Sequence, residues 1–132
     1  MRVLVVQNFD GTGLGQMRTA LSEAGATVEI VRVHHGEALP RRPDGHDALV
    51  VLGGGQNALA DADNPWLPEL CGLMRAFGDA GRSVLGICLG GQLLARAYEA
   101  ENIIGGASEF GWKEVELTPD GAADPVFSGL SA

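Results

Sequence analysis

One cysteine of this chain stands in a local sequence that could make it a nucleophile. Cys88 lies midway between Gly86 and Gly90 in the segment Gly86-Ile87-Cys88-Leu89-Gly90-Gly91-Gln92. A thiolate can attack a carbonyl carbon and form a covalent intermediate. The pattern Gly-x-Cys-x-Gly predicts a tight turn from a strand into a helix, where only small residues fit two positions to either side of the nucleophile. Backbone N–H groups at the start of that helix would favour the thiolate and could hold the oxyanion that forms during attack.

A second glycine-rich stretch could supply another oxyanion donor. Gly53-Gly54-Gly55-Gln56 follows an apolar run, and its N–H groups have no side chains in front of them. Such groups can point into a cleft. A flexible turn is the alternative, and we favour the oxyanion interpretation because both glycine stretches follow strands. The other cysteine, Cys71, falls within an apolar helical pattern, so we expect it in the core.

The elements that would position these residues can be read from the apolar pattern. Short runs rich in β-branched residues predict strands over 2–7, 27–33, 47–52 and 83–87, of which the first and third read as buried. Helical spacing of apolar residues predicts helices over 14–24, 65–80 and 90–100. Alternating strands and helices indicate an α/β fold with three layers around an open, mostly parallel sheet. Residues 112–117 alternate like a half-exposed strand, and 118–132 are rich in turn residues.

Composition excludes several classes of partner. The net charge of −8 and the lack of a basic stripe argue against nucleic-acid binding. Two cysteines are too few for a disulfide framework, and the first apolar run is too short for a signal peptide or membrane span. We therefore expect a cytoplasmic protein without a membrane partner. Residues 11–16 lack the third glycine of a dinucleotide fingerprint, so we expect no cofactor, and we expect no metal.

Three segments resemble a known family. Residues 86–95 resemble the nucleophile segment of class I (triad) glutamine amidotransferases, and Leu52-Gly53-Gly54-Gly55-Gln56 resembles the oxyanion loop of that family. Glu109-Phe110-Gly111-Trp112 is similar to the segment after the elbow helix. The likeness is greatest to stand-alone domains similar to the amidotransferase part of GMP synthase. The resemblance covers residues 1–132 and implies a flavodoxin-like fold and the N-terminal portion of one such domain.

The resemblance also implies roles for four positions. Cys88 matches the nucleophile that forms a γ-glutamyl thioester from L-glutamine. Leu89 and Gly55 match the positions whose backbone N–H groups form the oxyanion hole, and Gln92 matches a position that contacts the substrate. The ammonia released would pass to an acceptor held by a synthetase partner.

The chain departs from the family at the general base, which is a histidine in a His-x-Glu motif far downstream of the nucleophile. No histidine follows Cys88. We interpret His34 and His35 as surface-loop residues, and His46 as structural or solvated at the opposite end of the sheet. We expect that the C-terminal part of the domain is missing and that this chain alone has little or no glutaminase activity.

Two further expectations follow from the same interpretation. A sheet without its remaining strands would expose an edge or an apolar patch, so we expect low stability or self-association. A non-catalytic, amidotransferase-like binding module is the main alternative function. A flavodoxin-like ligand-binding domain is another, although that function would not explain the pattern Gly-x-Cys-x-Gly.

Overall fold

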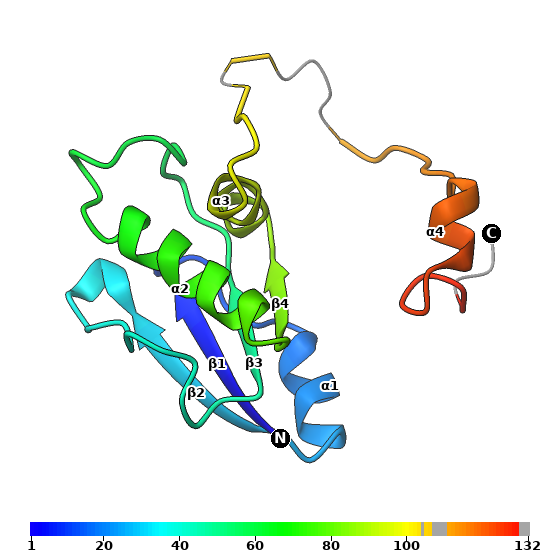
Figure 1. Ribbon diagram of the computed structural model, residues 1–132, viewed down its shortest axis with the longest axis horizontal. Helices are drawn as coiled ribbons and strands as arrows, with labels where there is room; N and C mark the ends of the chain where they lie inside the picture. Colours follow the sequence, from blue (N-terminus) through cyan, green and yellow to red (C-terminus); the bar gives the residue numbers. More distant parts are fainter. Residues whose placement is uncertain (104, 107–110, 130–132) are drawn as a thin grey trace.

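The computed structural model describes residues 1–103, 105–106 and 111–129. Four parallel strands form one sheet in the order β2-β1-β3-β4 (Figure 1). The strands are β1 (Arg2–Gln7), β2 (Thr27–Arg32), β3 (Ala48–Val51) and β4 (Ser83–Gly86). The chain passes from β1 to β2 on one side and then to β3 on the other, so the connections diverge between β1 and β3. In open α/β sheets, ligands bind at such a point, outside the carboxyl ends of the strands.

The central strand β1 shows why its sequence does not alternate. Leu4 and Val6 contribute to the larger apolar core on one face of the sheet, whereas Val3 and Val5 contribute to a smaller core on the other. All four side chains are buried. A strand buried on both faces needs apolar residues at every position.

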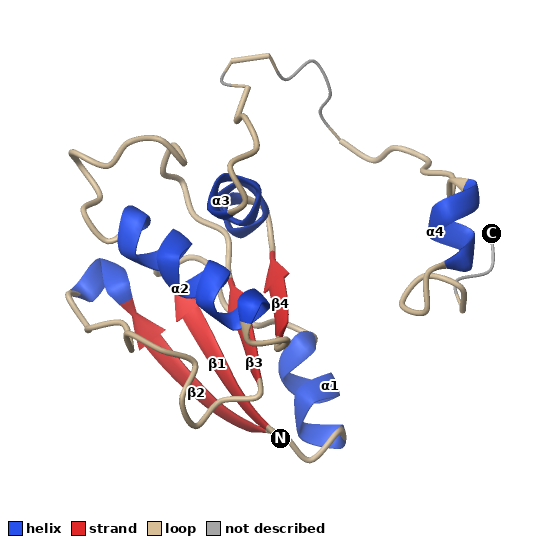
Figure 2. Cartoon of the chain, viewed as in Figure 1, coloured by secondary structure: helices blue, strands red, loops and turns tan. Residues whose placement is uncertain are grey.

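Helices cover both faces of the sheet, which confirms the three-layer α/β prediction. Helices α2 (Leu67–Asp79) and α3 (Leu89–Ala97) pack on the face of the larger core, and α1 (Met17–Glu23) packs on the other (Figure 2). Helix α1 begins three residues later than the sequence pattern suggests. Gly15 has a φ of +52°, a left-handed conformation that an α-helix cannot continue through.

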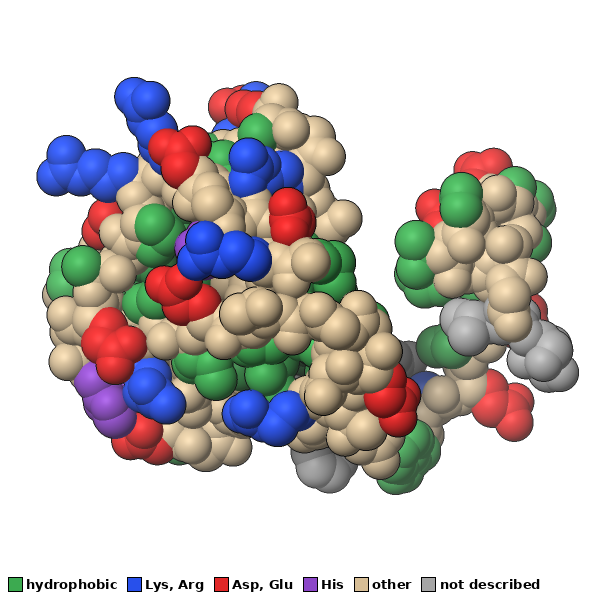
Figure 3. Space-filling model, turned by 90° about the horizontal axis from the view of Figure 1, so that it is seen from below, with side chains coloured by type: hydrophobic (Ala, Val, Ile, Leu, Met, Phe, Trp, Pro, Cys, Tyr) green, Lys and Arg blue, Asp and Glu red, His purple; other side chains and the backbone are tan. Residues whose placement is uncertain are grey.

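The prediction for residues 112–117 was wrong, because the described residues 111–117 form no strand. Trp112 and Val115 are exposed and lie beside no other strand, and a strand needs a hydrogen-bonding neighbour. The short helix α4 (Pro119–Ala123) follows instead, with the Thr118 hydroxyl accepting a hydrogen bond from the Gly121 N–H at 3.1 Å. Thr-Pro is a helix-start signal that the turn-rich reading passed over. This segment stands apart from the sheet and carries hydrophobic and acidic side chains (Figure 3).

The exposed edge expected from the sequence lies at β4. Leu85 is 46% exposed and Ile87 is 37% exposed, because α1 lies over β1 and β2 and leaves this face of β4 bare. Self-association through this edge stays a prediction. Within the described ranges, no helix is long and apolar enough to cross a membrane. On the face in Figure 3, basic side chains are interspersed with acidic ones rather than gathered.

Candidate active site

Cys88 occupies a strained backbone position directly before α3. Its φ of 55° and ψ of −112° place it in the mirror image of the β region, which residues with a side chain rarely adopt. Its carbonyl oxygen accepts hydrogen bonds from the Gly91 and Gln92 N–H groups at 2.9 and 3.1 Å, so it begins the helix. Cys88 is exposed to solvent. The strand-to-helix elbow predicted from the sequence is therefore present, and Cys88 stands in it at a positive φ.

The two flanking glycines are required by contact with backbone. A Cβ on Gly86 would overlap the Gly90 carbonyl, and a Cβ on Gly90 would overlap the carbonyl oxygen of Val51 in β3. Backbone atoms cannot rotate away as a side-chain end can. The turn therefore closes on itself and against the neighbouring strand, as the spacing of the glycines predicts.

The glycine loop after β3 lies directly beside the thiol. A Cβ on Gly53 would be 3.4 Å from the Cys88 Cβ and 3.9 Å from its Sγ. A Cβ on Gly54 would be 2.9 Å from Cδ2 of Leu89. Parallel pairing of β3 with β4 brings the two stretches together, since Val51 is the register partner of Gly86. The structure thus joins two glycine motifs that are more than 30 residues apart in sequence.

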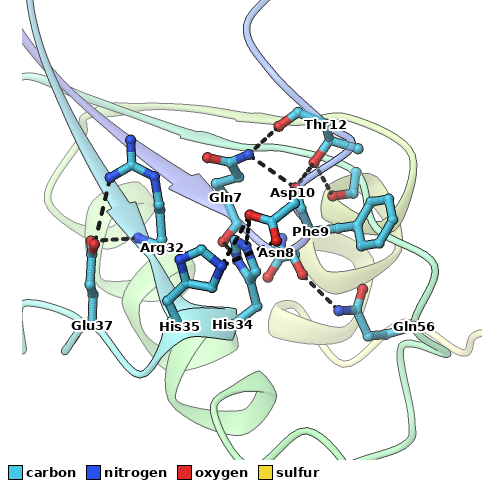
Figure 4. A network of polar contacts seen from close by, with 11 residues as sticks. Gln7, Asn8, Phe9, Asp10, Thr12, Arg32, His34, His35, Glu37 and Gln56 are labelled. Atoms are coloured by element: carbon cyan, nitrogen blue, oxygen red, sulfur yellow. Dashed lines mark hydrogen bonds and ion pairs between the residues drawn. The ribbon is translucent and has the colours of Figure 1, made fainter.

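Polar side chains from the loop after β1 hold the glycine loop in place (Figure 4). The buried Asn8 donates from Nδ2 to the Leu52 carbonyl at 2.9 Å, and Gln56 Nε2 donates to the Asn8 carbonyl at 2.7 Å. The Thr12 hydroxyl lies 2.9 Å from the Phe9 carbonyl oxygen and 3.1 Å from the Gly53 carbonyl oxygen, and it can donate its one hydrogen to either. The sequence interpretation missed Asn8 and Thr12, although polar residues directly after a buried strand were a usable signal.

The other expected site residues lie at different distances from the thiol. Leu89 is the first residue of α3, and its side chain is buried. Gln92 is exposed one turn further along the helix. Gly55 is exposed, and a Cβ there would meet nothing within 4 Å. Within the described part of the chain, neither the Leu89 nor the Gly55 N–H donates a hydrogen bond, so both donors are free for a ligand.

No histidine among the described residues hydrogen-bonds the Cys88 thiol. His34 and His35 follow β2, which is separated from β4 by β1 and β3. Three strand spacings correspond to about 14 Å. His46 is buried at the opposite edge and lies 2.9 Å from Glu29, which confirms its structural role.

The interpretation of His34 as a surface-loop residue was wrong. Its side chain is only 11% exposed. Its Nδ1 lies 3.0 Å from the Gln7 carbonyl and its Nε2 lies 3.0 Å from Asp10 Oδ1. The hydrogen bond to Asp10 raises the pKa of His34, and the same bond, together with one to His35, lowers the pKa of Asp10.

The letters His-x-Glu do occur once, at His35-Gly36-Glu37, upstream of the nucleophile. The sequence interpretation passed over this match. The Glu37 carboxylate accepts from the Arg32 N–H at 2.8 Å, and the His35 ring faces Asp10, so these two residues do not form a base and its orienting partner. Their position beside β2 also separates them from Cys88.

Two further features lie outside the elbow. Cys71 is buried in α2, as expected, and burial raises the pKa of its thiol. A cavity of about 310 Å³ opens between the loop after β2 and the start of α2, where Leu39 and Trp66 are among its lining residues. Cys88 does not line it. The cavity is thus separate from the elbow, where Cys88 is exposed to solvent.

Several known proteins are similar to this chain in sequence. Over 131 residues, the chain is 32% identical to the glutamine amidotransferase-like protein YfeJ of Salmonella typhimurium, spanning 97% of this chain and 55% of that protein. It is 36% identical over 110 residues to a GMP synthase of Rhodopseudomonas palustris, spanning 82% and 18%. It is 35% identical over 79 residues to gamma-glutamyl peptidase 4 of Arabidopsis thaliana, spanning 58% and 30%.

Solved structures share the fold. The crystal structure of SMU.1228c superposes with a TM-score of 0.90 and 25% identity, covering 99% of this chain and 57% of that one. A glutamine amidotransferase of Thermotoga maritima superposes with a TM-score of 0.67 and 29% identity, covering 73% and 42%. The chain thus spans about half, or less, of the length of the proteins it matches.

The family model described as "Glutamine amidotransferase class-I" matches residues 5–131. The matched region includes the elbow at Cys88 and the glycine loop beside it. Of the third resembling segment, Glu109 and Phe110 lie outside the described residues, whereas Gly111 and Trp112 are exposed. This chain belongs to the class I glutamine amidotransferase family.

Proposed function

We propose that this chain is the N-terminal portion of a glutamine amidotransferase domain that cleaves the side-chain amide of L-glutamine through Cys88. The observation that carries the proposal is the exposed thiol at a positive φ between β4 and α3, with Gly53 against it. A strained backbone that presents a nucleophile is typical of a working site. Family membership supplies the class of chemistry.

The reaction follows from the groups around the thiol. The Cys88 thiolate attacks the glutamine Cδ, and the carbonyl oxygen becomes an oxyanion. The free N–H groups of Leu89 and Gly55 would hold that oxyanion, and Gln92 would contact the substrate. Collapse breaks the C–N bond and releases the nitrogen as ammonia once a proton is supplied, leaving a γ-glutamyl thioester. Water then hydrolyses the thioester to glutamate and restores the thiol.

Among the described residues, no histidine contacts Cys88 to carry a proton during this reaction. A base must take the thiol proton and return it to the leaving nitrogen. The three histidines lie elsewhere, so we propose that the 132-residue chain has little or no glutaminase activity alone. Steady glutamine turnover by the purified chain that Cys88→Ser abolishes would contradict this.

Labelling by an electrophilic ketone analogue of glutamine tests the thiol itself. The analogue should modify Cys88 stoichiometrically and faster than it modifies free cysteine, as measured by intact mass and peptide mapping. The buried Cys71 is the internal control and should stay unmodified in the folded chain. Labelling of Cys88 no faster than free cysteine would favour the alternative, a non-catalytic amidotransferase-like binding module.

The likeness to gamma-glutamyl peptidase 4 suggests a second substrate class. Glutamine and γ-glutamyl peptides present the same carbonyl to the thiol and give the same thioester; they differ only in whether ammonia or an amine leaves. An electrophilic ketone analogue that carries a bulky group in the position of the leaving amine would separate them. Faster labelling by that analogue than by the glutamine analogue would favour the peptidase.

The proposal also includes a partner for the ammonia and a compartment for the protein. Ammonia from the reaction would pass to an acceptor held by a synthetase partner, which is consistent with the likeness to GMP synthase. Both cysteines are free thiols, which suits a reducing cytoplasm. Co-purification of a synthetase with the tagged protein would support this partner.

A further inference from the structure

Three ligand-type side chains converge at the carboxyl edge of the sheet, away from Cys88. They are Asp10, in the loop after β1, and His34 and His35, directly after β2 (Figure 4). One ligand atom from each lies within 4.8 Å of the other two. Among the described residues this is the one group of three that meets that criterion. Neither the proposed amide chemistry nor the glycine loop uses it.

The His34 ring is oriented as a metal ligand would be. A carbonyl oxygen can only accept, so Nδ1 carries a hydrogen and donates it to the Gln7 carbonyl. The other nitrogen, Nε2, then faces Asp10 Oδ1 at 3.0 Å. In the neutral ring both of these atoms are acceptors, so a cation must lie between them or a proton must sit on Nε2. Histidines that bind metals usually donate their second nitrogen to a carbonyl or carboxylate in this way.

The His35 ring approaches the same carboxylate from the side. Its Nε2 lies 3.1 Å from Oδ1 and 3.2 Å from Oδ2 of Asp10. The centroids of the two imidazole rings are 4.1 Å apart and the ring planes are tilted by 49°, so the rings lie against each other. Bonds of about 2.0–2.1 Å in a tetrahedral site separate neighbouring ligands by about 3.3 Å. The His–Asp separations are within a few tenths of an ångström of that value.

The donor set selects the class of ion. Two imidazole nitrogens and one carboxylate suit zinc and similar transition metals, whereas magnesium and calcium prefer oxygen ligands throughout. Asp10 is 72% exposed and His35 is 49% exposed, so solvent can complete the coordination. We propose that Asp10, His34 and His35 bind one divalent transition-metal ion of the zinc type, with at least one position open to water.

A bound ion would tie the loop after β1 to the end of β2. The same loop carries Thr12, whose hydroxyl lies 3.1 Å from the Gly53 carbonyl oxygen beside the proposed nucleophile. The ion would therefore stabilise the loop on which the glycine stretch rests. Binding to the folded chain alone would raise its melting temperature.

Zinc titration by calorimetry tests the site. The Cys88→Ala chain is used so that the exposed thiol cannot bind zinc, at about pH 8 so that protons do not compete for histidine. We expect one ion per chain and a higher melting temperature with zinc. Asp10→Asn, His34→Gln and His35→Gln should each weaken binding at least about tenfold, the scale found even for groups that only orient a ligand. When cobalt replaces zinc, the visible absorption spectrum should be that of a tetrahedral site rather than of an octahedral one.

Two matched variants serve as controls. Asp63→Asn removes another exposed carboxylate, and His46→Gln removes a histidine at the opposite edge. Neither should change the zinc affinity. If His34→Gln fails to fold because that ring is mostly covered, the exposed Asp10 and His35 variants carry the test. The proposal would be overturned if none of the three substitutions lowered the zinc affinity, or if the chain bound zinc no more tightly than the variant with all three substitutions. The three side chains would then form only an ion pair between protonated histidine and Asp10.

Discussion

The elbow at Cys88 and the cluster of Asp10, His34 and His35 lie on the same edge of the sheet but are built differently. The elbow comes from consecutive residues, and its shape is imposed by the glycines within it. The cluster joins Asp10 to histidines 24 and 25 positions away. It exists only because β1 and β2 pair in parallel, with Gln7 opposite Arg32 at their ends.

The difference teaches which kind of site a sequence can reveal by itself. A local motif encodes its own geometry, so its chemistry can be inferred before the fold is known. A composite site depends on the register of two strands. Asp10 lies three residues after β1, and the two histidines lie two and three residues after β2, but nothing in the sequence shows that these side chains meet. The two sites should accordingly respond to different kinds of substitution.

Gly90→Ala should have the largest effect on the elbow. The added Cβ would overlap the Val51 carbonyl and lie 3.1 Å from the Val51 Cβ, so β3 and α3 would have to separate. We expect a loss of about 3 kcal/mol in the free energy of unfolding, measured by urea denaturation. If the variant folds, its zinc affinity should be unchanged, because the cluster lies across the sheet.

Gly91→Ala is the matched control in the next residue of the same helix. Its Cβ would meet the Gly86 carbonyl oxygen at 3.6 Å, an ordinary contact. Alanine favours a helix over glycine, so stability should stay level or rise by up to about 1 kcal/mol. Equal losses for the two substitutions would mean that the glycine spacing does not impose the elbow.

The fold was largely predictable because each of its elements carries its own pattern. The four strands, the helices between them and the parallel arrangement of the sheet followed from apolar runs and helical spacing. Helix α1 was misplaced by three residues because a left-handed Gly15 is not visible as such in a sequence. Residues 112–117 have the alternation of a strand, but a strand also needs a neighbour, which sequence alternation does not show.

The site was predictable only where it is local. The positive φ at Cys88 and the small neighbours followed from Gly-x-Cys-x-Gly. The contact of Gly53 with Cys88 needed the order of β3 and β4, and the burial of His34 needed the pairing of β1 with β2. Asn8 and Thr12 were missed for the same reason, since their partners lie 44 and 41 residues away.

Cys88→Gly should reveal the strain stored at the elbow. Glycine adopts a φ of 55° and ψ of −112° freely, whereas alanine keeps the steric conflict of cysteine. Cys88→Gly should therefore be more stable than Cys88→Ala by about 1 kcal/mol or more in urea unfolding. No comparable gain is expected at Asp10→Gly, since Asp10 is not among the residues with positive φ. Equal stability of the two Cys88 variants would show that the elbow is unstrained.

Gly53→Ala should have a smaller effect, on access to the thiol rather than on stability. The new methyl group would lie 3.9 Å from the Cys88 Sγ without a clash. Modification of Cys88 by a small thiol reagent should slow roughly threefold, because reactivity depends on access. Gly55→Ala is the control, since a Cβ there meets nothing within 4 Å. If Gly55→Ala slowed the modification of Cys88 and Gly53→Ala did not, the position of Gly53 beside the thiol would be contradicted.

The smallest expected effect concerns the ion pair between Arg96 and Asp61. In this pair the cation is a side chain of the protein, whereas the cluster of Asp10, His34 and His35 would need a bound metal ion. Arg96 of α3 binds both carboxylate oxygens of Asp61 at 2.6 and 2.7 Å, and it also donates to the Ala58 carbonyl at 2.7 Å. These contacts fasten the loop that follows the glycine stretch to the elbow helix.

The hydrogen bond from Arg96 lowers the pKa of Asp61 below its ordinary value of 3.8. The unfolded chain therefore binds this proton more readily than the folded one. The resulting stability is present above pH 3.8 and is lost as the pH falls from there through the folded pKa. Asp61→Asn should make the acid limb of the unfolding free energy shallower, whereas Asp63→Asn, an exposed neighbour, should leave it as it is. An unchanged acid limb in Asp61→Asn would mean that solvent screens the pair and that the loop is held by the Ala58 contact alone.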